Sequence, residues 1–210
     1  MKKLRVGVLA SGSGSNLQAL IDATHRGEMG FEVAVVVSDN ADAEALNRAR
    51  RAGIPAIHVE PGDYRTRLEP SAEERCIEAL EQNSVDVVAL AGFMRILHER
   101  FLEHYRNRIV NIHPSLLPSF PGLDAQGQAF EYGVKWSGAT VHFVDAGVDT
   151  GPIIIQAAVP VLNDDTRDTL AARILEKEHE IYPEALDLLS RDRLRFEGRR
   201  VLVDEGEEDG

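Results

Sequence analysis

The stretch that decides the fold lies near the N-terminus and reads LRVGVLASGSGSNLQALID, residues 4–22. It opens with a short apolar run, which is typical of a buried strand. It closes with Leu17, Leu20 and Ile21 at helical spacing, and a turn rich in glycine and serine joins the two parts. A strand, a tight turn and a helix in this order are typical of the first unit of an open parallel sheet.

The same alternation continues through the first half of the chain. Four more apolar runs predict strands, at residues 31–39, 54–60, 85–93 and 108–113. The segments between them have helical patterns, at residues 43–53 and 71–85. Gly53 is suited to the end of the first of these helices, and Ser71 with Glu74 resembles a capping box at the start of the second. Strands that alternate with helices predict a parallel sheet with right-handed crossovers.

The second half has a different pattern. Residues 136–161 contain two strand-like runs around a turn rich in aspartate and glycine, which predicts an antiparallel pair. Residues 168–190 form a long amphipathic helical pattern, which Pro183 should kink or divide. Residues 193–204 indicate a terminal hairpin around Glu197 and Gly198.

The predicted fold class is α/β. We expect a doubly wound, Rossmann-like open sheet, parallel in the N-terminal half, with antiparallel strands added in the C-terminal half. Residues 1–203 are expected to form a single domain, and residues 204–210 an acidic, disordered tail.

Composition limits the function. The chain has 210 residues, 43% of them hydrophobic, and a formal net charge of −12, which argues against a nucleic-acid partner. No apolar run approaches the length of about 18 residues that indicates a membrane span, so a cytoplasmic protein with small-molecule partners is expected, as a monomer or a homodimer. The single cysteine, Cys76, excludes an internal disulfide and a multi-cysteine metal site, and its helical context indicates a core residue.

The turn SGSGSN, residues 11–16, joins the first predicted strand to the first helix, the position at which doubly wound sheets bind anions. It is not a dinucleotide fingerprint, because Leu17 stands where the third glycine would be, and it lacks the lysine of a nucleoside triphosphate loop. A single phosphate held by the amides of Gly14 and Ser15 and by the Asn16 region fits better. A tight turn between strand and helix is an equally good interpretation of the spacing alone.

The stretch NIHPSLLPSFPG, residues 111–122, follows the fifth predicted strand. Alternation places Asn111 and His113 on one face of that strand, about 6–7 Å apart along the backbone. An amide and an imidazole at a strand's carboxyl end could stabilise an oxyanion and move a proton, although a single histidine there is more often structural.

Asp149 is a third candidate. A carboxylate beside His113 would raise the pKa of the imidazole by favouring its charged form. Asp145, a few residues earlier, is better explained as a residue that builds the turn. His142 alternates with apolar neighbours in a predicted strand and could face either the core or the site.

Five motifs occur together and in order: SGSGSNLQALID, LAGFMRIL, NIHPSLLPSFPG, GATVHFVDAGVDTGPIIIQ and EHEIYP. On these motifs the chain resembles, over residues 4–189, the folate-dependent phosphoribosylglycinamide formyltransferases. The resemblance implies direct transfer of a formyl group from 10-formyltetrahydrofolate, the co-substrate, to the primary amine of phosphoribosylglycinamide in purine biosynthesis. It implies a tetrahedral oxyanion intermediate and no metal.

The resemblance also assigns residues. Asn111, His113 and Asp149 match the catalytic set. The substrate-binding positions would be Gly14, Ser15, Asn16 and Glu178. The folate-binding positions would be Arg67, Met94, Arg95, Ile96, Leu97 and Asn111, and Arg65 could replace Arg67 if the loop is shifted.

The chain departs from the family pattern at a few positions. Relatives commonly carry a histidine shortly after the PGL turn, where this chain has Ala125 and Gln126, so any role of that histidine would pass to Gln126 or Asp124. Leu175 stands where relatives often have a polar residue.

Two alternatives stay open: a formyl-folate hydrolase or another transferase on the same scaffold, and a non-catalytic folate- or nucleotide-binding protein. The presence of Asn111, His113 and Asp149 together argues against a non-catalytic protein.

Overall fold

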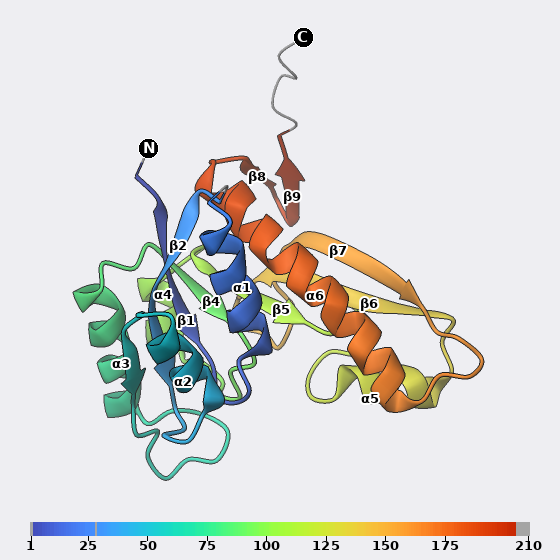
Figure 1. Ribbon diagram of the computed structural model, residues 1–210, viewed down its shortest axis with the longest axis horizontal. Helices are drawn as coiled ribbons and strands as arrows, with labels where there is room; N and C mark the ends of the chain where they lie inside the picture. Colours follow the sequence, from blue (N-terminus) through green and yellow to red (C-terminus); the bar gives the residue numbers. More distant parts are fainter. Residues whose placement is uncertain (1, 28, 205–210) are drawn as a thin grey trace. The chain divides into compact units, whose positions relative to one another are not determined.

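The computed structural model describes residues 2–27 and 29–204. The backbone forms two compact units, Met1–Asn111 and Ile112–Gly210 (Figure 1). From residue 205 onwards, the predicted acidic tail lies outside the described residues.

The first unit is built on parallel strands in the order β3-β2-β1-β4-β5. Their bounds are Leu4–Leu9 for β1, Phe31–Ser38 for β2, Ala56–His58 for β3, Val87–Leu90 for β4 and Ile109–His113 for β5. The division between the units falls inside β5, so Ile112 and His113 belong to the second unit. From β1 the chain adds β2 and β3 on one side of the sheet and then returns to add β4 and β5 on the other side of β1. Parallel α/β sheets bind ligands at such a switch point, here between β1 and β4.

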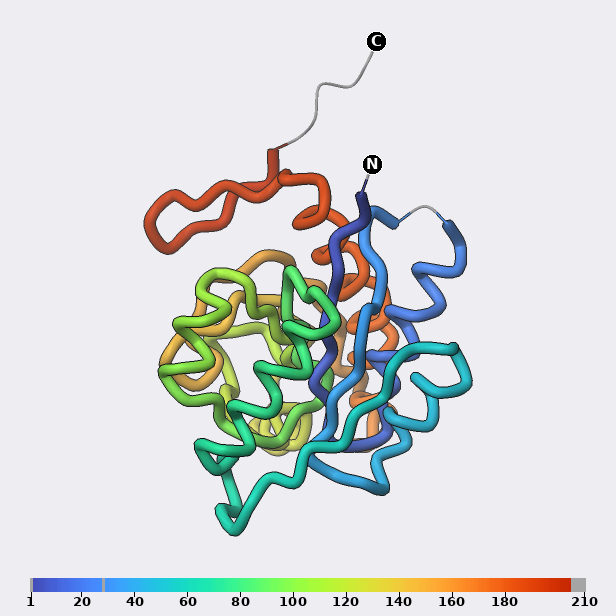
Figure 2. The backbone as a smooth tube through the Cα atoms, turned by 90° about the vertical axis from the view of Figure 1, so that its left-hand side faces the viewer, coloured from blue at the N-terminus to red at the C-terminus, as the bar shows by residue number. Residues whose placement is uncertain are grey.

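The helices of the first unit are α1 (Ser15–His25), α2 (Glu44–Arg51), α3 (Pro70–Gln82) and α4 (Glu99–His104). Right-handed crossovers place α1 and α2 on one face of the sheet and α3 and α4 on the other, as Figures 1 and 2 show. Helix α3 packs closely on the sheet at Gly7 of β1, where a Cβ atom would lie only 2.4 Å from the side chain of Leu80. The prediction of a doubly wound parallel sheet is confirmed for this half of the chain.

The second unit contains the antiparallel pair β6 (Trp136–Phe143) and β7 (Ile153–Pro160). Helix α6 (Arg167–Ser190) packs against both strands and against α5 (Ala125–Tyr132). The hairpin of β8 (Leu194–Glu197) and β9 (Arg200–Val203) follows α6 directly (Figure 2). The predicted antiparallel strands and terminal hairpin are therefore confirmed.

One local prediction about the helices is wrong, and of the two alternatives given for Pro183, division of the helix is excluded. Helix α3 begins at Pro70, after Glu69, and no side chain caps it, so Ser71 and Glu74 form no capping box. Proline is favoured at the first helical position because its missing N–H has no intrahelical partner there. Helix α6 is not divided at Pro183, which is buried, and the helix continues to Ser190.

Two further predictions about the first unit hold. Gly53 adopts a left-handed conformation with φ of 70° just after α2, as its position predicts. Cys76 is buried on α3. Among the described residues, no helix is long and apolar enough to cross a membrane.

Candidate active site

The second unit brings His113 and Asp149 together. His113, at the end of β5, is 4% exposed, and its Nδ1 lies 3.4 Å from Oδ2 of Asp149. Its Nε2 lies 2.9 Å from the carbonyl oxygen of Phe120 and donates to it. Asn111 lies two residues earlier on the same strand. The structure therefore pairs a buried imidazole with a half-buried carboxylate at the carboxyl end of β5.

Asp149 is held in place from several sides. Its backbone has a left-handed φ of 53°, which is uncommon outside glycine. The amide of Gly122 donates to Oδ2 at 2.8 Å, and Nε2 of His142 lies 3.6 Å from Oδ1. Burial alone would raise the pKa of the Asp149 carboxyl, but the bonds from His142 and Gly122 and the charge of His113 hold it below its ordinary value.

His142 is the member of this cluster that sequence reasoning did not assign to the site. It is 2% exposed, and its Nδ1 donates to the carbonyl oxygen of Phe143 at 2.8 Å. The pairing of β6 with β7 shifts register between Val141 and His142, and such bulges often redirect a side chain beside an active site. Alternation in the sequence suggested two possible faces for His142, and the structure places it in the site.

The pKa of His113 is set by opposing effects of burial and of neighbouring groups. Burial lowers the pKa of the His113 imidazole below its ordinary value. The Phe120 carbonyl and the Asp149 charge act in the opposite direction, and His142 adds to the lowering. The expected effect of Asp149 is confirmed, because its charge does raise this pKa, but the cost of burying an imidazolium is larger and the net shift is downward.

The proline-rich loop after β5 is fixed by a partly buried polar network. Oγ1 of Thr140, on β6, accepts from the amide of Leu117 at 3.1 Å and donates to the carbonyl of Ser115 at 2.7 Å. Nε2 of Gln156, on β7, donates to the carbonyl of Leu117 at 2.9 Å. This network holds the segment that supplies the Phe120 carbonyl and the Gly122 amide to the cluster.

The predicted phosphate loop lies in the first unit, at the reversal between β1 and β4. Gly14 has a φ of 70°, and a Cβ there would lie 2.8 Å from Cα of Ala45, so no other residue fits without a shift. The amide of Ser11 donates to the carbonyl of Gly92 at 3.1 Å. Helix α1 begins at Ser15, and a helix N-terminus presents amides suited to an anion.

The predicted folate segments also meet within the first unit. Arg67 pairs with Ile96 in an isolated parallel bridge, and its guanidinium lies 4.6 Å from the centre of the Tyr64 ring. Met94 and Ile96 are 60% and 59% exposed, whereas Leu97 is buried. Exposed apolar side chains beside an arginine could receive an aromatic, negatively charged ligand.

Arg95 is bound to protein groups. Its Nε lies 2.7 Å from Oδ2 of Asp39, and its Nη1 donates to the carbonyls of Tyr64 and Arg65 at 2.5 Å and 2.9 Å. The Arg95 guanidinium therefore ties three segments together. Arg65 contributes its carbonyl to this tie, whereas Arg67 lies beside the segment that contains Ile96.

The remaining predicted positions lie on helices of the second unit. Glu178 is buried on α6. Burial of Tyr182, and to a smaller extent the charge of Glu178, raises the pKa of Tyr182 well above the ordinary value. Asp124 precedes α5 and forms an ion pair with Arg167. Gln126, on α5, and Leu175, on α6, are half-buried.

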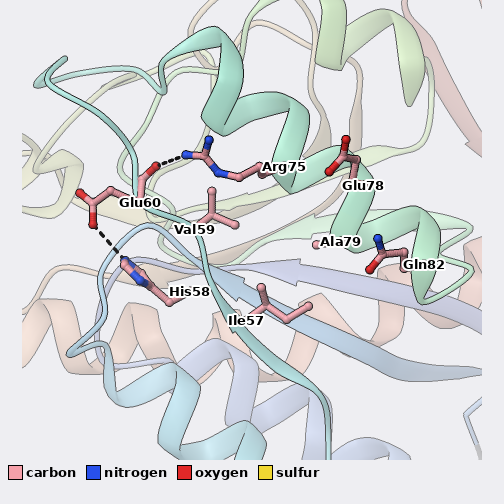
Figure 3. Close-up of a pocket in the computed structure, with 8 residues that line it drawn as sticks. All are labelled: Ile57, His58, Val59, Glu60, Arg75, Glu78, Ala79 and Gln82. Atoms are coloured by element: carbon pink, nitrogen blue, oxygen red, sulfur yellow. Dashed lines mark hydrogen bonds and ion pairs between the residues drawn. The ribbon is translucent and has the colours of Figure 1, made fainter.

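A cavity of about 510 Å³ lies between β3 and α3 in the first unit (Figure 3). Arg75 donates there to the carbonyl of Glu60, and His58 approaches the Glu60 carboxylate. None of the predicted site residues lines this cavity. Over residues 2–27 and 29–204, no group of three or more histidine, cysteine, aspartate or glutamate side chains is placed to hold a metal ion.

Comparison with known proteins shows the family to which this chain belongs. The family model described as formyl transferase matches residues 4–186, so the chain belongs to the formyl transferase family. The phosphoribosylglycinamide formyltransferase of Bacillus subtilis (strain 168) is 43% identical over 189 residues, which cover 90% of this chain and 95% of that protein.

The chain is also similar to a much longer relative and to a solved structure. The trifunctional purine biosynthetic protein adenosine-3 of Drosophila melanogaster is 50% identical over 190 residues, which are 90% of this chain but only 14% of that protein. The crystal structure of glycinamide ribonucleotide transformylase 1 from Symbiobacterium toebii aligns with a TM-score of 0.91 and 55% identity, covering 96% of this chain and 94% of that one.

Proposed function

We propose that this protein transfers the formyl group of 10-formyltetrahydrofolate to the primary amine of phosphoribosylglycinamide. The observation that carries the proposal is the pair of buried His113 and half-buried Asp149, 3.4 Å apart, at the end of the strand that bears Asn111. In a formyl transferase, this pair supplies a proton-transfer group and a fixed carboxylate where an oxyanion would form.

The reaction would proceed by direct attack. The substrate amine adds to the formyl carbon, and the carbonyl π electrons move onto oxygen to give a tetrahedral oxyanion. The Asn111 amide and the His113 imidazole would stabilise this negative charge. The oxyanion then collapses, the bond from carbon to N10 of the folate breaks, and N10 takes up a proton as the new formamide loses one.

The low pKa of His113 suits this proton transfer. In its protonated form His113 is a stronger acid than an ordinary histidine, because burial disfavours its charge. An oxyanion nearby would offset that cost and favour the imidazolium. We therefore expect His113 to become protonated as the intermediate forms, to exchange the Phe120 carbonyl that its Nε2 now binds for a new acceptor, and to give this proton, directly or through a water, to N10.

We assign the binding positions as the family resemblance suggests. Gly14, Ser15 and Asn16 would hold the phosphate of phosphoribosylglycinamide, and Glu178 would contact the same substrate. The folate would be bound by Arg67, Met94, Arg95, Ile96, Leu97 and Asn111. Because Asp39 and two carbonyls occupy the Arg95 guanidinium, we expect Arg95 to act on the folate chiefly by holding the loop that contains Arg67.

The direct test uses 10-formyl-5,8-dideazafolate as the formyl donor and follows its conversion to 5,8-dideazafolate by absorbance. The assay is run with and without phosphoribosylglycinamide. We expect turnover that requires the ribonucleotide and gives its N-formyl product. Equal turnover without the ribonucleotide would instead indicate a hydrolase, and no turnover under either condition would contradict an enzymatic role.

The catalytic assignment has its own test. Asn111→Ala or His113→Ala should lower kcat by about 10²–10³, the usual effect of removing one oxyanion donor. If either folded variant retained most of the wild-type turnover, the proposed role of that residue would be wrong.

A further inference from the structure

The segment that carries Asp149 is an ordered loop between β6 and β7, residues 144–152. Oδ1 of Asp145 accepts from the amide of Gly147 at 3.1 Å and from Oγ1 of Thr150 at 2.6 Å. These bonds shape the interior of the loop, as the sequence predicted for Asp145. They do not by themselves fix the loop against the rest of the second unit.

The C-terminal hairpin contacts both ends of this loop. The ring of Phe196, on β8, lies 4.9 Å from the ring of Phe143, the last residue of β6. Nη2 of Arg199, in the hairpin turn, donates to the carbonyl of Thr150 at 2.5 Å. One contact therefore lies just before the loop, and the other lies at the residue that follows Asp149.

Both contacts connect to the buried cluster. The carbonyl of Phe143 accepts from His142, whose other ring nitrogen faces Asp149. The two ends of the loop also touch, because a Cβ on Gly151 would lie only 1.7 Å from that same carbonyl oxygen. A displacement of either end would therefore be transmitted to the imidazole and the carboxylate.

We propose that the β8–β9 hairpin is a clamp on the Asp149 loop and that Arg199 is a positioning residue for the reaction. This inference rests on the proposed function for its kinetic consequence. Asp149 holds a left-handed backbone conformation, which persists only where the surroundings enforce it. Arg199 supplies part of that enforcement by fixing the carbonyl of Thr150, the residue that follows Asp149.

The kinetic test compares three variants. Arg199→Ala should lower kcat by about three- to tenfold, the effect of one hydrogen bond that orders a catalytic group, with little change in KM. Arg199→Lys keeps a cationic donor and should restore most of the lost turnover. Arg195→Ala is the matched control, because Arg195 lies in the same hairpin but pairs only with Glu197 and Asp204 among the described groups.

A second measurement does not depend on turnover. Amide hydrogen exchange of residues 143–152 should be faster in Arg199→Ala than in the wild type and unchanged in Arg195→Ala. An Arg199→Ala protein with wild-type kcat and wild-type exchange would overturn the clamp. Equal losses in the two alanine variants would also overturn it, since they would show general weakening of the hairpin.

The two measurements also separate this inference from the proposed function. If the wild-type protein does not formylate phosphoribosylglycinamide, the proposed function fails. The exchange experiment then still decides whether Arg199 orders the loop.

Discussion

The single carboxylate of Asp149 lies between two buried imidazoles, those of His113 and His142. Oδ2 faces His113 and Oδ1 faces His142, at 3.4 Å and 3.6 Å. The other ring nitrogen of each imidazole donates a hydrogen bond to a backbone carbonyl: that of Phe120 for His113 and that of Phe143 for His142. The carboxylate therefore cannot rotate without losing a partner on one side or the other.

Replacing His142 tests whether this second imidazole matters for turnover. His142→Gln should lower kcat by about ten- to a hundredfold, the effect of losing a hydrogen bond to a charged group. The pH dependence of kcat should also shift, because the pKa of Asp149 loses one of the causes that lower it. The measurement is a steady-state pH profile, with the surface variant His25→Asn as the control, and an unchanged profile and kcat would show that His142 only fills space.

The lowered pKa of His113 makes a prediction about stability. The unfolded chain binds a proton at this residue near the ordinary pKa of about 6.5, and the folded protein binds it only at lower pH. Protonation therefore favours the unfolded chain, and the stability present above about pH 6.5 is lost as the pH falls through the folded-state pKa. The lowered pKa of Asp149 affects stability in a separate pH range: the stability that it contributes is lost as the pH falls below the ordinary value of 3.8 towards the folded-state pKa.

The measurement is the free energy of unfolding in urea between pH 7.5 and pH 5. The wild-type protein should lose stability in that range more steeply than His113→Gln, which has no proton to bind there. The variant His25→Asn, changed at an exposed helix end, should follow the wild-type curve. Parallel curves for the wild type and His113→Gln would contradict the burial argument.

Residue pairs on one strand could be predicted from alternation, and the family resemblance named Asp149 as a partner of His113, but the spacing alone could not show which side chains from different segments meet. Alternation placed Asn111 and His113 on one face of β5 without any knowledge of the fold. Alternation in residues 140–143 could not decide which face His142 occupies. The net pKa shift of His113 depends on how deeply three other segments bury it, which the sequence does not state.

The elements that escaped prediction are short helices without a strong apolar period. Helix α5, with the sequence AQGQAFEY, contains a glycine and starts after Asp124 in a left-handed conformation. Its small buried residues, Ala125, Gly127 and Ala129, let it pack closely against α6. Tertiary packing therefore stabilises α5 more than local propensity does, whereas the long strands and α6 could be recognised from their own patterns.

The first turn of α6 offers a test at this scale. Thr166 accepts from the amide of Thr169 at 3.2 Å, and Oγ1 of Thr169 accepts from the amide of Thr166 at 2.9 Å, a reciprocal cap that the sequence reading missed. Thr166→Ala should lower the free energy of unfolding by about 1 kcal/mol. Urea titration would measure the loss, with Glu176→Ala, an exposed change in the middle of the helix, expected to have a smaller effect.

At the scale of the whole molecule, the order of helices and strands could be predicted because each half of the sequence has its own pattern of apolar residues and turns. Continuous apolar runs with intervening helices gave the parallel strands of the first unit, and a turn rich in aspartate and glycine gave the pair β6 and β7. A single domain over residues 1–203, a cytoplasmic location and a monomeric or homodimeric state stay predictions.

The single cysteine reports on the integrity of the first unit. Burial on α3, with a smaller effect of Glu73, raises the pKa of the Cys76 thiol to about 12. At pH 7.5 we expect a thiol reagent to label it at least about three orders of magnitude more slowly than an ordinary cysteine, because only the thiolate reacts. Labelling should become fast and stoichiometric in concentrated urea, and rapid labelling of the folded protein would show that α3 opens readily.

The position of Trp136 has a practical consequence for fluorescence. It is the only tryptophan in the chain, and it is 61% exposed at the start of β6. Its indole already meets water in the folded protein, so unfolding should change its emission wavelength only slightly. Thermal melts recorded by intrinsic fluorescence will therefore understate the transition, and circular dichroism or calorimetry is the better choice for every variant described above.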